Sequence, residues 1–131
     1  MDTPQSTDHN KAVVRRVYTE FTNQRRLEVA AELFSPEFVD HGAPETRRGV
    51  EGVTETTRLF MAAFPDFQFE IESLIAEGDL VHVRGTITGT QQGPYAGLPA
   101  SGKQARWSAM DDFRFEGDKA RIVRRNFMRR P

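Results

Sequence analysis

The stretch richest in chemical groups is 107–115, WSAMDDFRF, where two adjacent carboxylates interrupt an aromatic run. Side chains alternate along a strand, so Asp111 would share one face with Trp107 and Phe113. An acid among aromatic rings loses solvation of its charged form, which raises its pKa and suits it to proton transfer near neutral pH. We therefore predict Asp111 as a catalytic residue, while Asp112 faces solvent. The alternative is that Asp111 caps a loop or pairs with an arginine.

A second candidate is His41, which follows the short segment EFVD at 37–40. An imidazole at the rim of a cavity could act as a base at neutral pH, so His41 is the predicted catalytic base. The alternative is a histidine hydrogen-bonded to a loop carbonyl. Asp40 would orient it or face water. His9 and His82 are predicted to be exposed, and without close ligand spacing or any cysteine we predict no metal site.

Helical patterns fill the first half of the chain and would position these groups. Apolar residues recur at helical spacing over 13–21, over 27–34 and from Gly49 or Val50 to residue 63. Each pattern predicts one amphipathic helix. Between the second and third helices, 37–42 reads as a brief extended piece.

Strand patterns fill the second half. Alternation over 67–71 and β-branched residues over 79–88 predict a hairpin, and the glycine-rich loop 89–103 separates it from the Asp111 strand. A last strand covers 120–128. Three helices followed by about four antiparallel strands predict an α+β domain, in which a sheet bent over the helices encloses a cone-shaped apolar cavity.

Composition fits one compact domain, with a flexible tail at 1–8 and a single domain at 9–131. The net charge of −1, from 18 basic and 19 acidic residues, gives no reason to expect nucleic acid or membrane as a partner. The absence of cysteine and of a secretory or membrane-spanning segment favours a cytoplasmic protein. No phosphate-binding glycine loop follows a strand, so we predict no nucleotide cofactor.

Aromatic residues on the helices and strands are expected to line the cavity, because core and pocket wall are the same surface in such an architecture. A flat, polycyclic or extended apolar ligand would suit them. The residues predicted to contact it are Tyr18, Phe60, Phe64, Trp107 and Phe113.

Several segments carry a family resemblance: PEFVDHG, AFPDF, IAEGDLVHVRGTITGTQQG, GLPASGK and MDDFRFEGDK resemble the SnoaL-like polyketide cyclases of the nuclear transport factor 2 superfamily. The resemblance covers nearly the whole chain after residue 10 and implies a cone-shaped fold that hosts many reactions. Those cyclases commonly carry a histidine where this chain has Asp111, and an acid on the last strand, where this chain reads IVRRNFM. Asn126 stands in that region and is predicted to contact substrate. Relatives described as hydroxylases also lack the last-strand acid.

A more distant similarity links AVVRRVYTEFTN and DDFRF to the ketosteroid isomerases. It implies that Asp111 matches their hydrogen-bonding aspartate, that Tyr18 lies within one residue of their oxyanion tyrosine, and that His41 falls near their general base.

These resemblances and residues together predict a cofactor-independent enzyme of secondary metabolism, such as antibiotic biosynthesis, acting on a polyketide-like carbonyl compound as a cyclase or hydroxylase. Protonated Asp111 would donate a hydrogen bond to the carbonyl as it becomes an enolate, and His41 would move the α proton. The alternatives are a double-bond isomerase and a non-catalytic module that binds a small molecule. Relatives usually pair through the open sheet face, which implies a homodimer.

Overall fold

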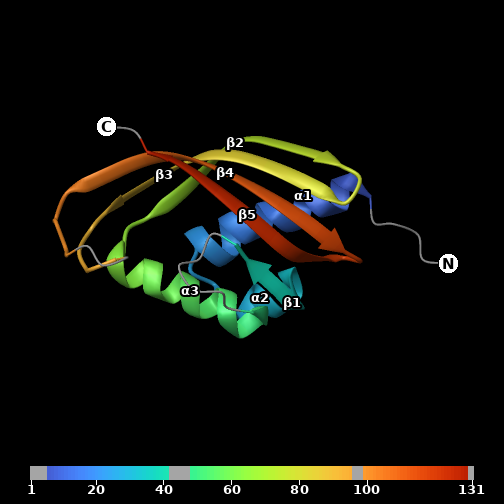
Figure 1. Cartoon of the computed structure of the whole chain (residues 1–131), viewed down its shortest axis with the longest axis horizontal. Coiled ribbons are helices and arrows are strands. Elements are labelled where there is room, and N and C mark those ends of the chain that lie inside the picture. The colour runs from blue at the N-terminus through green and yellow to red at the C-terminus, as the bar shows by residue number, and fades with distance from the viewer. Residues whose placement is uncertain (1–5, 42–47, 96–98, 130–131) are drawn as a thin grey trace.

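The computed structural model describes residues 6–41, 48–95 and 99–129, and the side chains up to residue 120. A single mixed sheet of five strands, in the order β1-β5-β4-β3-β2, arches over the helices (Figure 1). The strands are β1 Phe34–Asp40, β2 Gln68–Glu77, β3 Leu80–Thr90, β4 Gln104–Glu116 and β5 Lys119–Arg129. The last four pair antiparallel in sequence order, as the alternation predicts.

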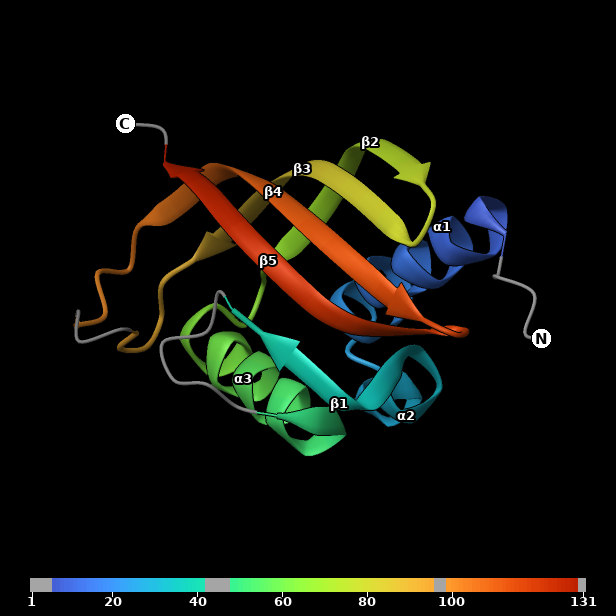
Figure 2. The same ribbon diagram turned by 45° about the vertical axis from the view of Figure 1, so that its right-hand side comes forward.

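All helices of the described chain lie on one side of this sheet (Figures 1 and 2). α1 packs beneath β2 and β3, and α3 packs against β1. The helical elements are α1 Thr7–Arg16, the π-helix η1 Val17–Asn23, the 3-10 turn η2 Leu27–Val29, α2 Ala30–Leu33 and α3 Gly49–Ala63. The predicted bounds of the third helix therefore agree with α3.

The first helix begins earlier than predicted. The Ser6 hydroxyl accepts a hydrogen bond of 3.1 Å from the backbone N–H of His9, which caps the free amides of the first turn. Val13, Val14 and Val17 then form the buried stripe. The helix thus starts at Thr7, six residues before the apolar pattern that we predicted from residue 13, and the predicted tail at 1–8 lies mostly outside the described residues.

The second predicted helix, over 27–34, is mostly absent as a regular α-helix in the structure. Helical structure over 27–34 shrinks to one 3-10 turn and one short α-turn, and Phe34 already belongs to β1. β1 runs parallel to β5, with Phe34 opposite Ala120 and Asp40 opposite Val123. The predicted extended piece at 37–42 is thus, as far as the structure describes it, the end of an edge strand that pairs with β5 through a shifted register between Phe34 and Val39.

The core lies between the helices and the concave face of the sheet. Its fully buried large side chains come from every layer, and they include Phe21 of η1, Phe34 and Phe38 of β1, and Phe113 of β4. Rings of the first three meet edge to face, at centroid distances of 5.3 and 4.6 Å. No helix in the described part of the chain is long and apolar enough to span a membrane.

Candidate active site

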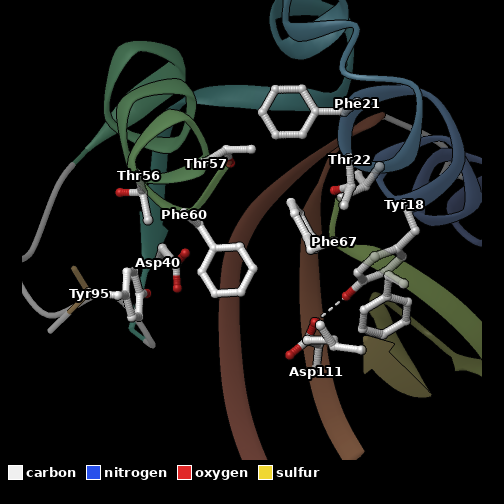
Figure 3. Close-up of a pocket in the computed structure, with 13 residues that line it drawn as sticks. Tyr18, Phe21, Thr22, Asp40, Thr56, Thr57, Phe60, Phe67, Tyr95 and Asp111 are labelled. Carbon is white, nitrogen blue, oxygen red and sulfur yellow. Dashed lines mark hydrogen bonds between the residues drawn. The ribbon is translucent and has the colours of Figure 1, made fainter. Parts of the chain in front are cut away.

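A cavity of about 70 Å³ lies between η1, α3 and the concave face of the sheet (Figure 3). Its wall is mainly aromatic, with two carboxylates and several hydroxyls among the rings. The lining residues are Val17, Tyr18, Phe21, Thr22, Asp40, Thr56, Thr57, Phe60, Phe67, Phe69, Ile87, Tyr95 and Asp111.

The most distinctive polar contact in this cavity joins Tyr18 and Asp111. The Tyr18 hydroxyl donates a hydrogen bond to Oδ2 of Asp111, although the two residues lie 93 positions apart in the chain (Figure 3). Tyr18 is 3% exposed and Asp111 is 2% exposed. Burial makes the charged form of a carboxyl group costly, so a hydroxyl donor at this position directly offsets the lost hydration.

The π-helix η1 and its neighbours position the Tyr18 ring. The ring stacks on Phe69 of β2 at a centroid distance of 4.0 Å and an interplanar angle of 21°. The edge contact with Phe113 of β4 is at 6.0 Å and 84°. A π-helix is a locally widened turn that is common at functional sites. Contacts with two strands therefore fix the direction in which the hydroxyl points.

The second carboxylate of the cavity is Asp40, which is only 3% exposed. It ends β1, where it shares a strand face with Phe38, and the two side chains are buried together. Figure 3 shows Asp40 on the side of the cavity that also carries Thr56 and Tyr95, with Asp111 and Tyr18 on the other. Two acids from different strands therefore face one aromatic space.

His41, the predicted base, is placed differently. It is exposed in the turn that follows β1, and it is not among the residues that line the cavity. Because β1 turns Asp40 inward, the next residue along the chain points away from the cavity. Asp40, and not His41, is thus among the residues that line the cavity, and the catalytic role of His41 stays a prediction.

The other predicted contacts divide into two groups. Phe60 lines the cavity together with Tyr18, as expected, whereas Phe64, Trp107 and Phe113 lie behind the lining. Their rings still support it, since Trp107 and Phe64 contact each other at 5.6 Å and Phe60 stacks on Phe64 at 4.9 Å. In the strand register Asn126 pairs with Met110, while Asp111 pairs with position 125.

Several lining residues were not predicted. Thr56 and Thr57 precede the predicted Phe60 on α3 by four and three residues, and this spacing, which places side chains on one helix face, is a usable signal in the sequence. Tyr95 belongs to the loop between β3 and β4, whose residues 92 and 93 donate backbone hydrogen bonds to the Ala63 carbonyl at 2.8 and 3.2 Å. Its ring meets Phe60 at 5.2 Å. No periodic pattern marks a loop residue of this kind.

Arg25 follows the C-terminal end of η1 and contacts Phe67, which lines the cavity. Arg25 has a left-handed backbone, with φ of 59°, and its guanidinium lies 4.8 Å from the centroid of the Phe67 ring. Burial lowers the pKa of Arg25, and the nearby Asp66 opposes that shift. Within the described residues no three histidine, aspartate or glutamate side chains gather as metal ligands would.

Comparisons with known proteins agree with this geometry. A family model described as SnoaL-like polyketide cyclase matches residues 12–126. No curated protein sequence matches significantly. The solved structures that resemble this fold include AclR, a proposed hydroxylase from Streptomyces galilaeus, which is 26% identical with a TM-score of 0.79 over 96% of this chain and 93% of that one.

Two further structures are similarly close. A proposed polyketide cyclase from Acidithiobacillus ferrooxidans is 26% identical, with a TM-score of 0.78 over 97% of this chain and 91% of that one. A proposed SnoaL-like polyketide cyclase from Jannaschia is 24% identical, with a TM-score of 0.86 over 97% of this chain and 90% of that one. The chain thus has the nuclear transport factor 2-like α+β fold. With a family model that spans most of its length, the chain belongs to the SnoaL-like polyketide cyclase family.

Proposed function

We propose that this protein is an enzyme that enolises a polyketide-like carbonyl compound, without a cofactor, as one step of a cyclase-type or hydroxylase-type reaction. The observation that carries the proposal is the buried hydrogen bond between Tyr18 and Asp111 in an aromatic cavity that also holds Asp40. Family membership and the cyclase and hydroxylase descriptions of its structural neighbours support the same class of chemistry.

When substrate binds, the Tyr18 hydroxyl turns its hydrogen from Oδ2 of Asp111 to the carbonyl oxygen of the substrate, and neutral Asp111 donates its own proton to the same oxygen. Two carboxyl groups that face one buried cavity do not readily both ionise, so we assign the neutral form, with a proton to share with an oxygen, to Asp111 and the charged form to Asp40. Negative charge develops on that oxygen as the enolate forms. Donors fixed in a site that excludes water stabilise such charge far more than donors in water do. Their rigid placement against Phe69 and Phe113 supports this role.

Asp40 serves as the base. Its carboxylate takes the proton from the carbon next to the carbonyl, and the electrons of that C–H bond form the enolate. The carbon then attacks an electrophile or regains a proton, and Asp40 returns its proton to the product. Because Asp40 and Asp111 come from different strands, one can act on the α carbon while the other holds the oxygen.

The cavity also restricts the substrate. Its lining suits an apolar body with one carbonyl group that reaches Tyr18 and Asp111. An engineered apolar cavity of about 150 Å³ binds benzene. The present volume of about 70 Å³ is smaller, so a ring-sized ligand must displace lining side chains as it binds. A polycyclic ligand requires a larger rearrangement.

Exchange of α protons tests this proposal without knowledge of the natural substrate. The protein is incubated with 2-tetralone in deuterated water, and loss of the α-proton signals is followed by NMR. Tyr18→Phe and Asp111→Asn should each reduce the exchange rate by about 10²- to 10³-fold, the usual cost of one oxyanion donor. Asp40→Asn should abolish catalysed exchange, because the amide cannot accept the proton.

The strand offers its own matched control, because Asp112 is the adjacent carboxylate and points to the opposite face, where Oδ1 meets Nδ1 of His82 at 2.5 Å. Asp112→Asn and His41→Ala should keep wild-type exchange. Wild-type exchange in both Asp111→Asn and Asp40→Asn would disprove the mechanism. Saturable binding of 2-tetralone without any catalysed exchange would instead favour a binding module.

A further inference from the structure

The side chain of Asn23, at the end of η1, pairs with the main chain of Phe69 as a neighbouring strand would. Its Nδ2 donates to the Phe69 carbonyl at 2.9 Å, and its Oδ1 accepts from the Phe69 N–H at 2.8 Å. β2 is the edge strand of the sheet, so the outward main-chain groups of Phe69 have no further strand to pair with. One amide therefore completes the ladder at a single residue.

The Phe69 side chain links this pairing to the candidate active site, because its ring contacts Tyr18. Its ring is 4% exposed and stacks on the Tyr18 ring at 4.0 Å. On its other side the ring lies against Gly85, where an added Cβ would fall 2.4 Å from Cε1 of Phe69. The ring is thus confined between a glycine backbone and the tyrosine that reaches Asp111. Any displacement of the Phe69 main chain moves the surface on which Tyr18 rests.

A second tie holds the same end of the π-helix. Nη1 of Arg25 donates to the carbonyls of Thr22 and Asn23 at 3.0 and 3.1 Å, and Nη2 donates to the Pro65 carbonyl at 2.9 Å. Helix ends leave carbonyl groups without intrahelical partners, and this guanidinium satisfies two of them. Arg25 thereby fixes the backbone from which the Asn23 amide projects.

We propose that Asn23 is a positioning residue, which fixes the Tyr18 hydroxyl against Asp111 through the main chain and ring of Phe69. The inference rests on the proposed function, since it explains how one donor of the site is held. Asn23 does not line the cavity and need not touch the substrate. Its contribution is to keep a hydroxyl on a widened helical turn within the narrow range of directions that catalysis requires.

The test uses a signal that Tyr18 itself supplies, because the chain has only two tyrosines. In protein labelled with ¹³Cζ-tyrosine, Tyr18→Phe assigns the two resonances, and the Tyr18 resonance reports the hydrogen bond of its hydroxyl. Asn23→Ala should shift and broaden that resonance and leave the Tyr95 resonance unchanged. Asn23→Asp keeps the acceptor for the Phe69 N–H and should produce an intermediate shift.

Asp66→Ala is the matched control. The Asp66 carboxylate also makes two hydrogen bonds to a strand, to the Thr90 N–H at 2.7 Å and to the Thr90 hydroxyl at 2.8 Å. Its loss should lower stability and leave the Tyr18 resonance in place. A Tyr18 resonance unchanged in Asn23→Ala and Asn23→Asp, or shifted as much by Asp66→Ala, overturns the proposal. Should Asn23→Ala not fold, Asn23→Asp decides by the same criterion.

Kinetics then separate this inference from the proposed function. With 2-tetralone, Asn23→Ala should lower kcat by about tenfold to a hundredfold at nearly constant KM, as expected for a misdirected donor. If the Tyr18 resonance shifts in Asn23→Ala while Tyr18→Phe keeps wild-type exchange, positioning by Asn23 stands and the proposed catalytic role of Tyr18 fails. If the resonance does not shift while Tyr18→Phe is inactive, the proposed function stands and the positioning role fails.

Discussion

Gly85 of β3 is the position where a single methyl group should most disturb both the fold and the site. A Cβ built at Gly85 lies 2.4 Å from the Glu70 carbonyl oxygen, and 2.4 and 2.7 Å from two carbons of the Phe69 ring. Ordinary contacts of a Cβ begin at 3.4 Å, so the shortest of these contacts is too close by 3.4 − 2.4 = 1.0 Å. The Glu70 oxygen belongs to the backbone of the adjacent strand, so a side-chain rotation cannot relieve the clash.

Gly85→Ala should therefore lower the free energy of unfolding more than an ordinary overpacking substitution in a core does. Overpacking costs about 1–3 kcal/mol when side chains can adjust, and a backbone clash places this variant at or above the upper end. For a domain of this size, a loss of about 3 kcal/mol corresponds to a fall in Tm of about 10 °C. The displaced Phe69 ring should also carry Tyr18 with it, so the ¹³Cζ resonance of Tyr18 should move.

The control for this prediction lies in the same hairpin. Gly78 has φ of 59°, and a Cβ there meets nothing within 4 Å. Gly78→Ala should cost only the strain of a left-handed alanine, about 1–2 kcal/mol. Urea unfolding of both variants measures the difference in the free energy of unfolding. A Gly85→Ala variant no less stable than Gly78→Ala, with an unshifted Tyr18 resonance, would refute the packing argument.

Three further changes test other parts of the fold. Hydrogen bonds from Thr90, first from its backbone N–H, lower the pKa of Asp66. The ionised Asp66 therefore stabilises the folded protein fully above the ordinary aspartate pKa of about 3.9, and this stabilisation is lost as pH falls through the pKa of the folded state. The difference in stability between wild type and Asp66→Asn, measured by thermal unfolding, should narrow below about pH 4. Ser6→Ala removes the cap on the His9 N–H and should cost about 1 kcal/mol in urea unfolding. Leu33→Ala empties a fully buried position and should cost about 2–5 kcal/mol by the same measurement, while a cost below 1 kcal/mol would show that the core collapses around the gap.

The sequence predicts the antiparallel part of this fold because its signals are local. Period-2 alternation marks β2 to β4, and a helical stripe marks α3. β1 was harder to predict because it pairs with β5, more than 80 residues later in the chain, and the register shifts between Phe34 and Val39. The π-helix η1 continues an α-helical pattern of buried residues, so periodicity alone does not reveal where α1 ends.

The site shows the same division between local and distant signals. Asp111 could be singled out from its aromatic neighbours, and the structure places it in the cavity wall. Asp40 and His41 are adjacent, and the sequence alone does not tell which of the two side chains points inward until the register of the strand is known. Burial of Phe38 fixes that register and selects Asp40. The homodimer and the catalytic role of Asp111 stay predictions.

The mixed topology of the sheet explains how two carboxylates reach one cavity from opposite sides. β4 brings Asp111 to the concave face, where η1 covers it and supplies Tyr18. β1 reaches the same space as the outer neighbour of β5, beneath α3, and ends there with Asp40 (Figure 2). Because the last strand has no acid between residues 120 and 129, a second carboxylate could only come from another element that borders the cavity. The parallel edge strand meets that requirement, which makes the position of Asp40 a consequence of the fold.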